Sequence, residues 1–302
     1  MCFVAAAARC ARAAAPHARA WRSAGLCGLA VLLASCAWLD VRQREIVYRP
    51  TPGRPANFAG LRPGDVSFSV EVPAERPGRT DRLQMWWLPQ PDPRAPTLLY
   101  LHGTFRNLYQ NLPKIESLRL AGFAVLAVDY RGWGDSTPLV PSEATIYADA
   151  NVAWQQLVLY QADPRKRVIY GHSMGSGVAV ELASRRRVGT DYAALILESS
   201  FTTLPDVARV VGMAGQVAAW FATQQFDSLA KIGRVDAPVL MLHGTADRTV
   251  PIVLGRRLYR SAPPGTQWVE IEGGSHSSLN TDAPEPYQQA LRELMRRIEA
   301  AP

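Results

Sequence analysis

The sequence predicts an α/β protein in which an eight-stranded, mostly parallel sheet is covered by helices on both faces. Short runs rich in valine, leucine and isoleucine alternate with helical segments from residue 66 onward, as in successive βαβ units. Several of these runs, such as Thr97–Leu101, are apolar almost without interruption, which is typical of central strands buried on both faces. A Gly-His-Ser-Met-Gly sequence at residues 171–175 joins one such run directly to a helical segment.

The first 36 of the 302 residues have the pattern of a signal peptide. Arginines without acidic residues precede an apolar stretch at 24–36, which is shorter than the about 20 residues that a transmembrane helix needs. The stretch ends in Leu33-Ala34-Ser35-Cys36, which is similar to a bacterial lipobox, in which the cysteine is lipidated and becomes the mature N-terminus. We therefore expect an exported lipoprotein, held on the periplasmic face of a membrane through Cys36. An uncleaved N-terminal anchor and an organelle-targeting presequence are the alternatives.

Charge and cysteine content exclude several classes of protein. The net charge of +7 includes Arg9, Arg12, Arg19 and Arg22, and the rest of the chain has no concentrated basic stripe, so we expect no nucleic-acid partner. All four cysteines lie within the first 36 residues, which excludes a disulfide framework, a cysteine nucleophile and a thiolate metal site from the rest. The sequence has no cofactor fingerprint and no pattern of metal ligands, so we expect neither a cofactor nor a metal ion.

The remaining elements follow in order. Residues 37–64 are rich in proline and glycine and predict an extended lead-in to a domain at 65–302. The first two expected strands, 66–72 and 82–88, form a hairpin, and the others are 97–101, 123–128, 167–170, 193–197, 239–242 and 267–271. Helices are expected at 108–121, 142–160, 176–184 and 284–298. An insertion at about 199–237 contains an apolar helix and predicts a small cap.

The sequence at 171–175 fits a nucleophile elbow, a sharp turn from a strand into a helix. Such a turn has room only for glycine two positions to either side of the serine, and it holds the serine hydroxyl clear of the strand. The N-terminus of the following helix directs N–H groups and the positive end of its dipole at the same point. Ser173 is therefore the expected nucleophile.

A serine nucleophile needs a base and an acid, which elbow-type hydrolases supply in the chain order serine, acid, histidine. Of the five histidines, His276 alone lies in a suitable place for the base, in a glycine-containing loop after the last strand. Asp247 follows the preceding strand and is the expected acid, with Glu198 at the end of the sixth strand in reserve. His172 and His243 are expected to have structural roles.

An oxyanion hole needs two N–H donors directed at the negative charge that develops during acyl transfer, and each is worth about 3 kcal/mol. The backbone N–H of Met174, at the start of the helix, is the expected first donor. The second is expected from the loop after strand 97–101, where Thr104 is preferred and Phe105 is the alternative.

These sequences together resemble the α/β-hydrolase superfamily over about residues 80–298. The resemblance rests on residues 101–103 (Leu-His-Gly), 129–134 (Asp-Tyr-Arg-Gly-Trp-Gly), 171–175, 198–202 (Glu-Ser-Ser-Phe-Thr), 243–247 with Val250-Pro251, and 273–276. The chain is similar to small-capped serine hydrolases, which include eukaryotic protein depalmitoylases and bacterial lysophospholipase-like and esterase-like enzymes. It departs from many of them at Thr104-Phe105, where they have a smaller pair.

The triad and the resemblance predict a serine hydrolase that cleaves carboxylic ester or thioester bonds through an acyl-enzyme. Residues 207–221 carry one charged residue, Arg209, and are expected either to pack against the domain or to form an acyl-chain groove or membrane-facing lid. A small cap and a lipid anchor favour substrates with acyl chains, including lipids. A serine peptidase of the same fold and a non-enzymatic lipoprotein scaffold are the alternatives.

Overall fold

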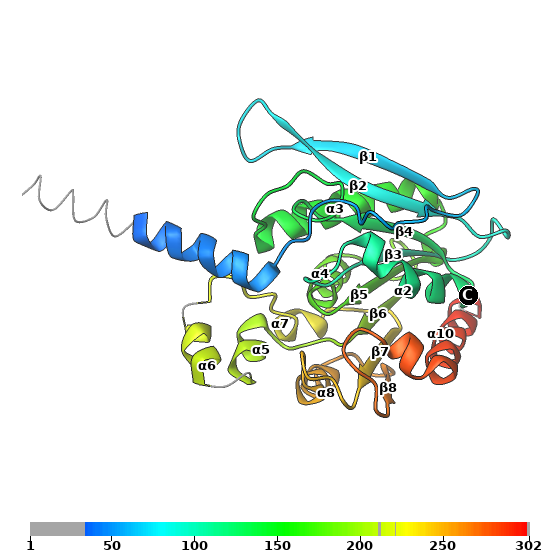
Figure 1. Cartoon of the computed structure of the whole chain (residues 1–302). Coiled ribbons are helices and arrows are strands. Elements are labelled where there is room, and N and C mark those ends of the chain that lie inside the picture. The colour runs from blue at the N-terminus through cyan, green and yellow to red at the C-terminus, as the bar shows by residue number, and fades with distance from the viewer. Residues whose placement is uncertain (1–33, 211–212, 221, 301–302) are drawn as a thin grey trace, which may run out of the picture. The chain divides into compact units, whose positions relative to one another are not determined.

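The computed structural model describes residues 34–210, 213–220 and 222–300, so residues 1–33 of the predicted signal peptide lie outside the described residues. The chain divides into two compact units, 1–43 and 44–302. A helix runs over residues 34–48 and contains Cys36, whose thiol is free and exposed (Figure 1). Within the described ranges, no helix has both the length and the apolar sequence that a membrane crossing requires.

The expected extended lead-in is therefore helical at its start. Residues 37–48 contain no proline or glycine, and the helix ends just before Arg49, whose φ is 42° and which precedes Pro50. The rest of the lead-in contributes to the second unit, because the Tyr48 side chain is fully buried and Pro52 forms a β-bridge with Gly134.

The second unit is built on an eight-stranded sheet in the order β1-β2-β4-β3-β5-β6-β7-β8 (Figure 1). The strands are β1 (Val66–Pro73), β2 (Thr80–Leu88), β3 (Thr97–Leu101), β4 (Ala124–Asp129), β5 (Arg167–His172), β6 (Ala194–Glu198), β7 (Val239–Gly244) and β8 (Gln267–Ile271). β2 pairs antiparallel with β1 and β4, whereas the pairs from β4 to β8 are parallel. The predicted eight-stranded, mostly parallel sheet is confirmed.

Helices cover both faces of this sheet (Figure 1). They are α2 (Leu108–Leu120), α3 (Glu143–Tyr160), the 3₁₀ helix η1 (Pro164–Lys166), α4 (Met174–Ala183), α5 (Leu204–Val210), α6 (Met213–Trp220), α7 (Leu229–Ile232), α8 (Ile252–Arg260), α9 (Leu279–Asp282) and α10 (Pro284–Glu299). Residues of α3, α4 and α8 pack on one face, and residues of α2 and α10 pack on the other. The expected apolar cap helix is divided into α5 and α6, and α8 is a helix that the sequence analysis did not predict.

The side chains of the central strand β3 contribute to the hydrophobic cores on both faces of the sheet. All five of its residues are buried; Leu98 and Tyr100 join the core beneath α2 and α10, and Leu99 and Leu101 join the core beneath α3 and α4. Each buried leucine stabilises the fold by about 1.5–3 kcal/mol relative to an exposed one. This packing fixes the carboxyl ends of the strands, where the expected site residues lie.

Truncating the centre of β3 is expected to destabilise the whole second unit. Leu99→Ala removes a fully buried side chain and should lower the free energy of unfolding by about 2–5 kcal/mol. Urea denaturation followed by circular dichroism measures the change. Leu120→Ala at the end of α2 is the control, because Leu120 is 77% exposed; equal losses in the two variants would contradict this description of the core.

Candidate active site

The turn between β5 and α4 has the geometry of an elbow. Ser173 lies there with φ 55° and ψ −124°, a conformation that costs a non-glycine residue free energy. A Cβ atom added to Gly171 would lie 2.1 Å from the carbonyl oxygen of Gly175, and one added to Gly175 would lie 2.1 Å from that of Leu101. Neither position therefore has room for a side chain, as the sequence pattern requires.

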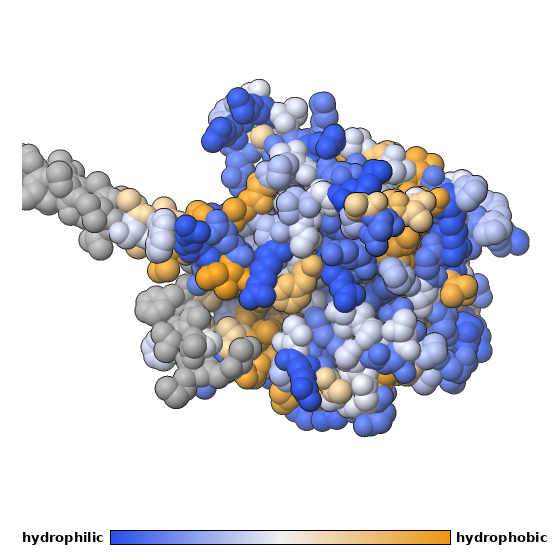
Figure 2. All heavy atoms as spheres, in the orientation of Figure 1, coloured by the Kyte–Doolittle hydropathy of each residue, from blue (hydrophilic) through white to orange (hydrophobic). Residues whose placement is uncertain are grey.

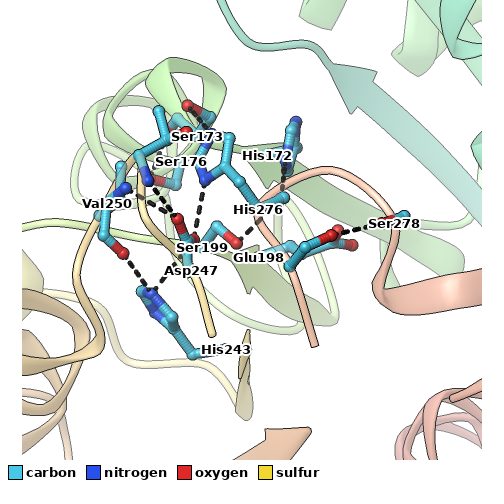
Figure 3. Close-up of polar contacts among 12 residues, drawn as sticks. His172, Ser173, Ser176, Glu198, Ser199, His243, Asp247, Val250, His276 and Ser278 are labelled. Carbon is cyan, nitrogen blue, oxygen red and sulfur yellow. Dashed lines mark hydrogen bonds and ion pairs between the residues drawn. The ribbon is translucent and has the colours of Figure 1, made fainter. Parts of the chain in front are cut away.

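The structure brings the three expected triad residues together at the carboxyl ends of the parallel strands (Figure 3). His276 Nε2 lies 2.9 Å from Ser173 Oγ, and His276 Nδ1 lies 2.8 Å from Asp247 Oδ2. An ionised carboxylate only accepts hydrogen bonds, so the His276 atom that faces it, Nδ1, carries the ring proton. His276 Nε2 is then free to accept a hydrogen bond from the serine hydroxyl. All three side chains are buried.

Asp247 is held as a carboxylate by several donors. Its Oδ1 accepts the N–H groups of Thr249 (2.9 Å) and Val250 (2.8 Å). Burial opposes ionisation, but hydrogen bonds from His243 and His276 outweigh it and hold the pKa of Asp247 well below its usual range. Because this pKa is lower in the folded chain, ionised Asp247 stabilises the fold above the ordinary aspartate pKa, and this contribution disappears as the pH falls through the depressed value.

His243, which the sequence suggested was a packing residue, contacts the acid directly. Its Nε2 lies 2.9 Å from the Val250 carbonyl oxygen and 3.5 Å from Asp247 Oδ2 (Figure 3). The ring thus closes the far side of the Asp247 carboxylate. The signal for this contact is the spacing of four residues between His243 and Asp247.

The backbone of the histidine loop is fixed by two donors from neighbouring strand ends. The His276 carbonyl accepts from His172 Nε2 at 2.9 Å and from Ser199 Oγ at 3.2 Å. In addition, Asp282 of α9 accepts the N–H of Ser275 at 2.8 Å. His172 therefore supports the loop that carries His276, a contact that no local sequence pattern indicates.

Glu198, the reserve candidate for the acid, is engaged elsewhere. Its carboxylate accepts the Tyr170 hydroxyl at 2.5 Å and the Tyr287 hydroxyl at 3.0 Å, and it also contacts the Lys114 ammonium group. The structure places Asp247, and not Glu198, against His276. The Glu198 backbone nevertheless touches the elbow, because its carbonyl accepts the Ser173 N–H at 2.9 Å.

The two segments expected to carry the oxyanion donors lie beside the nucleophile. Met174 is the first residue of α4, where helical N–H groups have no partner within the helix. The loop after β3 runs beside Ser173, since a Cβ atom added to Gly103 would lie 3.0 Å from Ser173 Cβ. This loop is anchored by the Trp133 indole, which donates to the Thr104 carbonyl at 2.6 Å. Thr104 is buried, whereas Phe105 is exposed.

The cap combines exposed apolar residues with a polar hollow. Trp220 at the end of α6 is 83% exposed. A hollow of about 450 Å³ between α5, α6 and α7 is lined in part by Asp206, Arg209, Asp227 and Arg257, a composition that does not suit an acyl chain. On the face of the second unit seen in Figure 2, apolar residues form small separate patches among hydrophilic ones.

A serine bonded to histidine and then to an ionised aspartate can attack a carbonyl carbon, because the histidine takes the serine proton and the aspartate stabilises the resulting imidazolium. In the described part of the chain, no group of three or more histidine, cysteine, aspartate and glutamate side chains is arranged to hold a metal ion.

A mostly parallel sheet with a serine elbow, followed in the chain by an acid and a histidine, defines the class of α/β-hydrolases. The family model described as serine aminopeptidase, S33, matches residues 92–230. Alpha/beta hydrolase domain-containing protein 17C of Mus musculus is 30% identical over 237 residues, which cover 76% of this chain and 68% of that protein. The chain belongs to the α/β-hydrolase superfamily and is a hydrolase, as the sequence predicted.

Two further similarities extend this comparison. Lysophosphatidylserine lipase ABHD12 of Danio rerio is 35% identical over 179 residues, which cover 54% of this chain and 46% of that protein. The solved structure of the esterase Pf2001 of Pyrococcus furiosus matches 83% of this chain and 98% of its own, with a TM-score of 0.63 and 20% identity. At this identity, the structural likeness supports the fold alone.

The packing of the elbow makes Gly175 sensitive to a single methyl group. Gly175→Ala is expected to lower the free energy of unfolding by about 1–3 kcal/mol, because the Leu101 carbonyl must move aside. Gly233→Ala is the matched control, since its added Cβ would lie 3.8 Å from the nearest atom, a comfortable distance. Chemical denaturation of both variants measures the difference; a Gly175→Ala protein as stable as the control would show that the turn is looser than described.

Proposed function

We propose that this protein is a serine hydrolase that cleaves carboxylic ester or thioester bonds of substrates with acyl chains. The observation that supports the proposal best is the continuous hydrogen-bonded series from Ser173 through His276 to Asp247. In the first step, Ser173 Oγ attacks the substrate carbonyl carbon while His276 Nε2 takes the hydroxyl proton. Asp247, ionised and fixed by its backbone donors, stabilises the imidazolium that forms.

The N–H groups of Met174 and Thr104 donate hydrogen bonds to the substrate carbonyl oxygen and stabilise the negative charge that develops on it. Collapse of the tetrahedral intermediate breaks the bond to the alcohol or thiol, which leaves with the proton from His276, and the acyl group stays on Ser173 Oγ. Water then attacks the acyl-enzyme with His276 again as the base, and the carboxylic acid is released with the serine restored.

Ester chemistry is favoured over peptide chemistry by the contents of the cap. A peptidase that binds a free amino terminus needs an available carboxylate near its substrate. In the described part of the cap, each aspartate already accepts a hydrogen bond within the chain: Asp206 from the Thr202 hydroxyl (2.6 Å), Asp227 from the Ala230 N–H (3.0 Å) and Asp236 from the Val188 N–H (3.0 Å). The name of one similar protein, a lysophosphatidylserine lipase, supports the same choice, whereas the family description supports peptidase activity as the second candidate.

We also propose that the protein is exported and attached to a membrane through a lipid on Cys36, facing the periplasm. This proposal comes from the basic and apolar sequence before Leu33-Ala34-Ser35-Cys36. It is supported by the exposure of the Cys36 thiol at the start of helix 34–48. Attachment by more than one acyl chain would hold the enzyme stably at the surface where acyl lipids are present.

Replacing the nucleophile is expected to abolish ester hydrolysis. In Ser173→Ala, kcat/KM for p-nitrophenyl esters of short to long acyl chains should fall about a thousandfold or more, and fluorophosphonate labelling should disappear. Ser184→Ala, at the other end of α4, is the control and should retain activity. Hydrolysis of aminoacyl p-nitroanilides but not of esters would instead favour the peptidase, and a folded wild-type protein without turnover or labelling would rule out both.

The lipid anchor is tested by Cys36→Ser in a bacterial host. The wild-type protein is expected to incorporate labelled palmitate, to have the mass of a chain beginning at residue 36, and to sediment with membranes. The variant should lose the label and the cleavage, whereas Cys27→Ser should retain both. Membrane association of the Cys36→Ser and wild-type proteins at full-length mass without palmitate would instead identify an uncleaved anchor.

A further inference from the structure

A buried ion pair lies close to the candidate base and takes no part in the triad. Lys114 of α2 and Glu198 of β6 have side chains that are 4% and 0% exposed, and the ammonium group contacts Glu198 Oε1. Hydroxyl groups of Tyr170 and Tyr287 donate to the other carboxylate oxygen. Buried ion pairs are often no more stabilising than apolar residues of the same volume, so stability alone does not explain this one.

His172 connects the ion pair with the histidine loop. It is the register partner of Glu198 in the β5–β6 pairing. Its Nε2 lies 2.9 Å from the His276 carbonyl oxygen, and its ring centroid lies 5.1 Å from that of His276 (Figure 3). On its other side, His172 Nδ1 would lie 3.4 Å from a Cβ added to Gly103, so the ring fills the space between the base loop and the oxyanion loop.

The environment of His172 decides its charge. A carbonyl oxygen only accepts hydrogen bonds, so the His172 Nε2 atom carries a proton and the neutral ring has none on Nδ1. Burial and the positive charge of Lys114 lower the pKa of His172 to about 3, against the opposing effect of Glu198. In the described chain, the charged and titratable groups that face the ring are Lys114 from α2, Glu198 from β6 and His276 from the loop after β8.

We propose that Lys114 is a positioning residue of the reaction, because its pairing with Glu198 prevents that buried anion from favouring a charged His172 beside His276. The inference rests on the proposed role of His276 as the base. If Lys114 is removed, Glu198 becomes an unpaired anion next to His172 and raises the pKa of the ring, which favours its protonated form. A cation at a ring distance of 5.1 Å then opposes the positive charge that His276 must acquire when it accepts the Ser173 proton.

Removing Lys114 and removing Glu198 should therefore have different consequences, which a structural role would not produce. Lys114→Met should add an acidic limb to the pH profile, so that the fluorophosphonate labelling rate of Ser173 falls about tenfold more than in the wild type between about pH 8 and about pH 6. Glu198→Gln and the double variant Lys114→Met/Glu198→Gln should lack this added acidic limb, since neither contains the unpaired anion. Lys231→Met is the matched control, because Lys231 pairs with Glu181 at 2.9 Å on another helix.

Identical profiles in all variants, or the same acidic limb in Glu198→Gln, would overturn the inference.

Nitrogen NMR of histidine-labelled wild-type protein, assigned with His172→Gln, gives a second test that needs neither turnover nor a folded Lys114 variant. His172 should remain the neutral Nε2–H tautomer from about pH 5 to about pH 8, although model histidine titrates near pH 6.5. Titration of His172 in this range overturns the inference even if Ser173 is labelled, whereas absent labelling with a neutral His172 contradicts the proposed function alone.

Discussion

The close approach of β3, β5 and the start of α4 is the constraint on which the site depends. Gly175 packs so tightly against the Leu101 carbonyl that no side chain fits, and the same packing forces Ser173 into a positive φ. The strained turn is held by the hydrogen bond from the Ser173 N–H to the Glu198 carbonyl at 2.9 Å. Because strain of this kind persists only where the surroundings fix it, the buried strands supply the free energy that maintains the nucleophile in place.

The end of β6 connects the elbow to the rest of the site through hydrogen bonds. The Glu198 carbonyl holds the nucleophile, and the next residue, Ser199, donates its hydroxyl to the His276 carbonyl at 3.2 Å. The Glu198 side chain reaches Lys114 in the helix that follows the oxyanion loop. Two consecutive residues thus connect the elbow, the base loop and α2, and a shift in the register of β6 would disturb all three together.

Local sequence patterns were sufficient to predict the succession of strands and helices along the chain, the elbow, and the three residues Ser173, Asp247 and His276 that the structure brings together. Each of these depends on a short segment and its place along the chain. Helix α8 was missed because Gly255 and three arginines obscure its apolar positions, although Gly255 is needed where its backbone packs against His243. The contacts of His172 with His276 and of Lys114 with Glu198 join residues 104 and 84 positions apart. They arise from strand register and helix packing, which composition and periodicity do not encode.

Two neighbouring histidines in this site need different charges, and the protein achieves this through their surroundings. His276 faces Asp247, whose low pKa keeps an anion in place to stabilise the imidazolium formed during the reaction. His172 faces a cation that is itself neutralised by Glu198, and all three side chains are buried. An apolar pair in place of Lys114 and Glu198 would leave burial alone to keep His172 neutral, whereas Glu198 without Lys114 would favour the protonated ring. Lys114 therefore cancels the charge of Glu198 at the His172 ring, so that His276 is the histidine that becomes charged during the reaction.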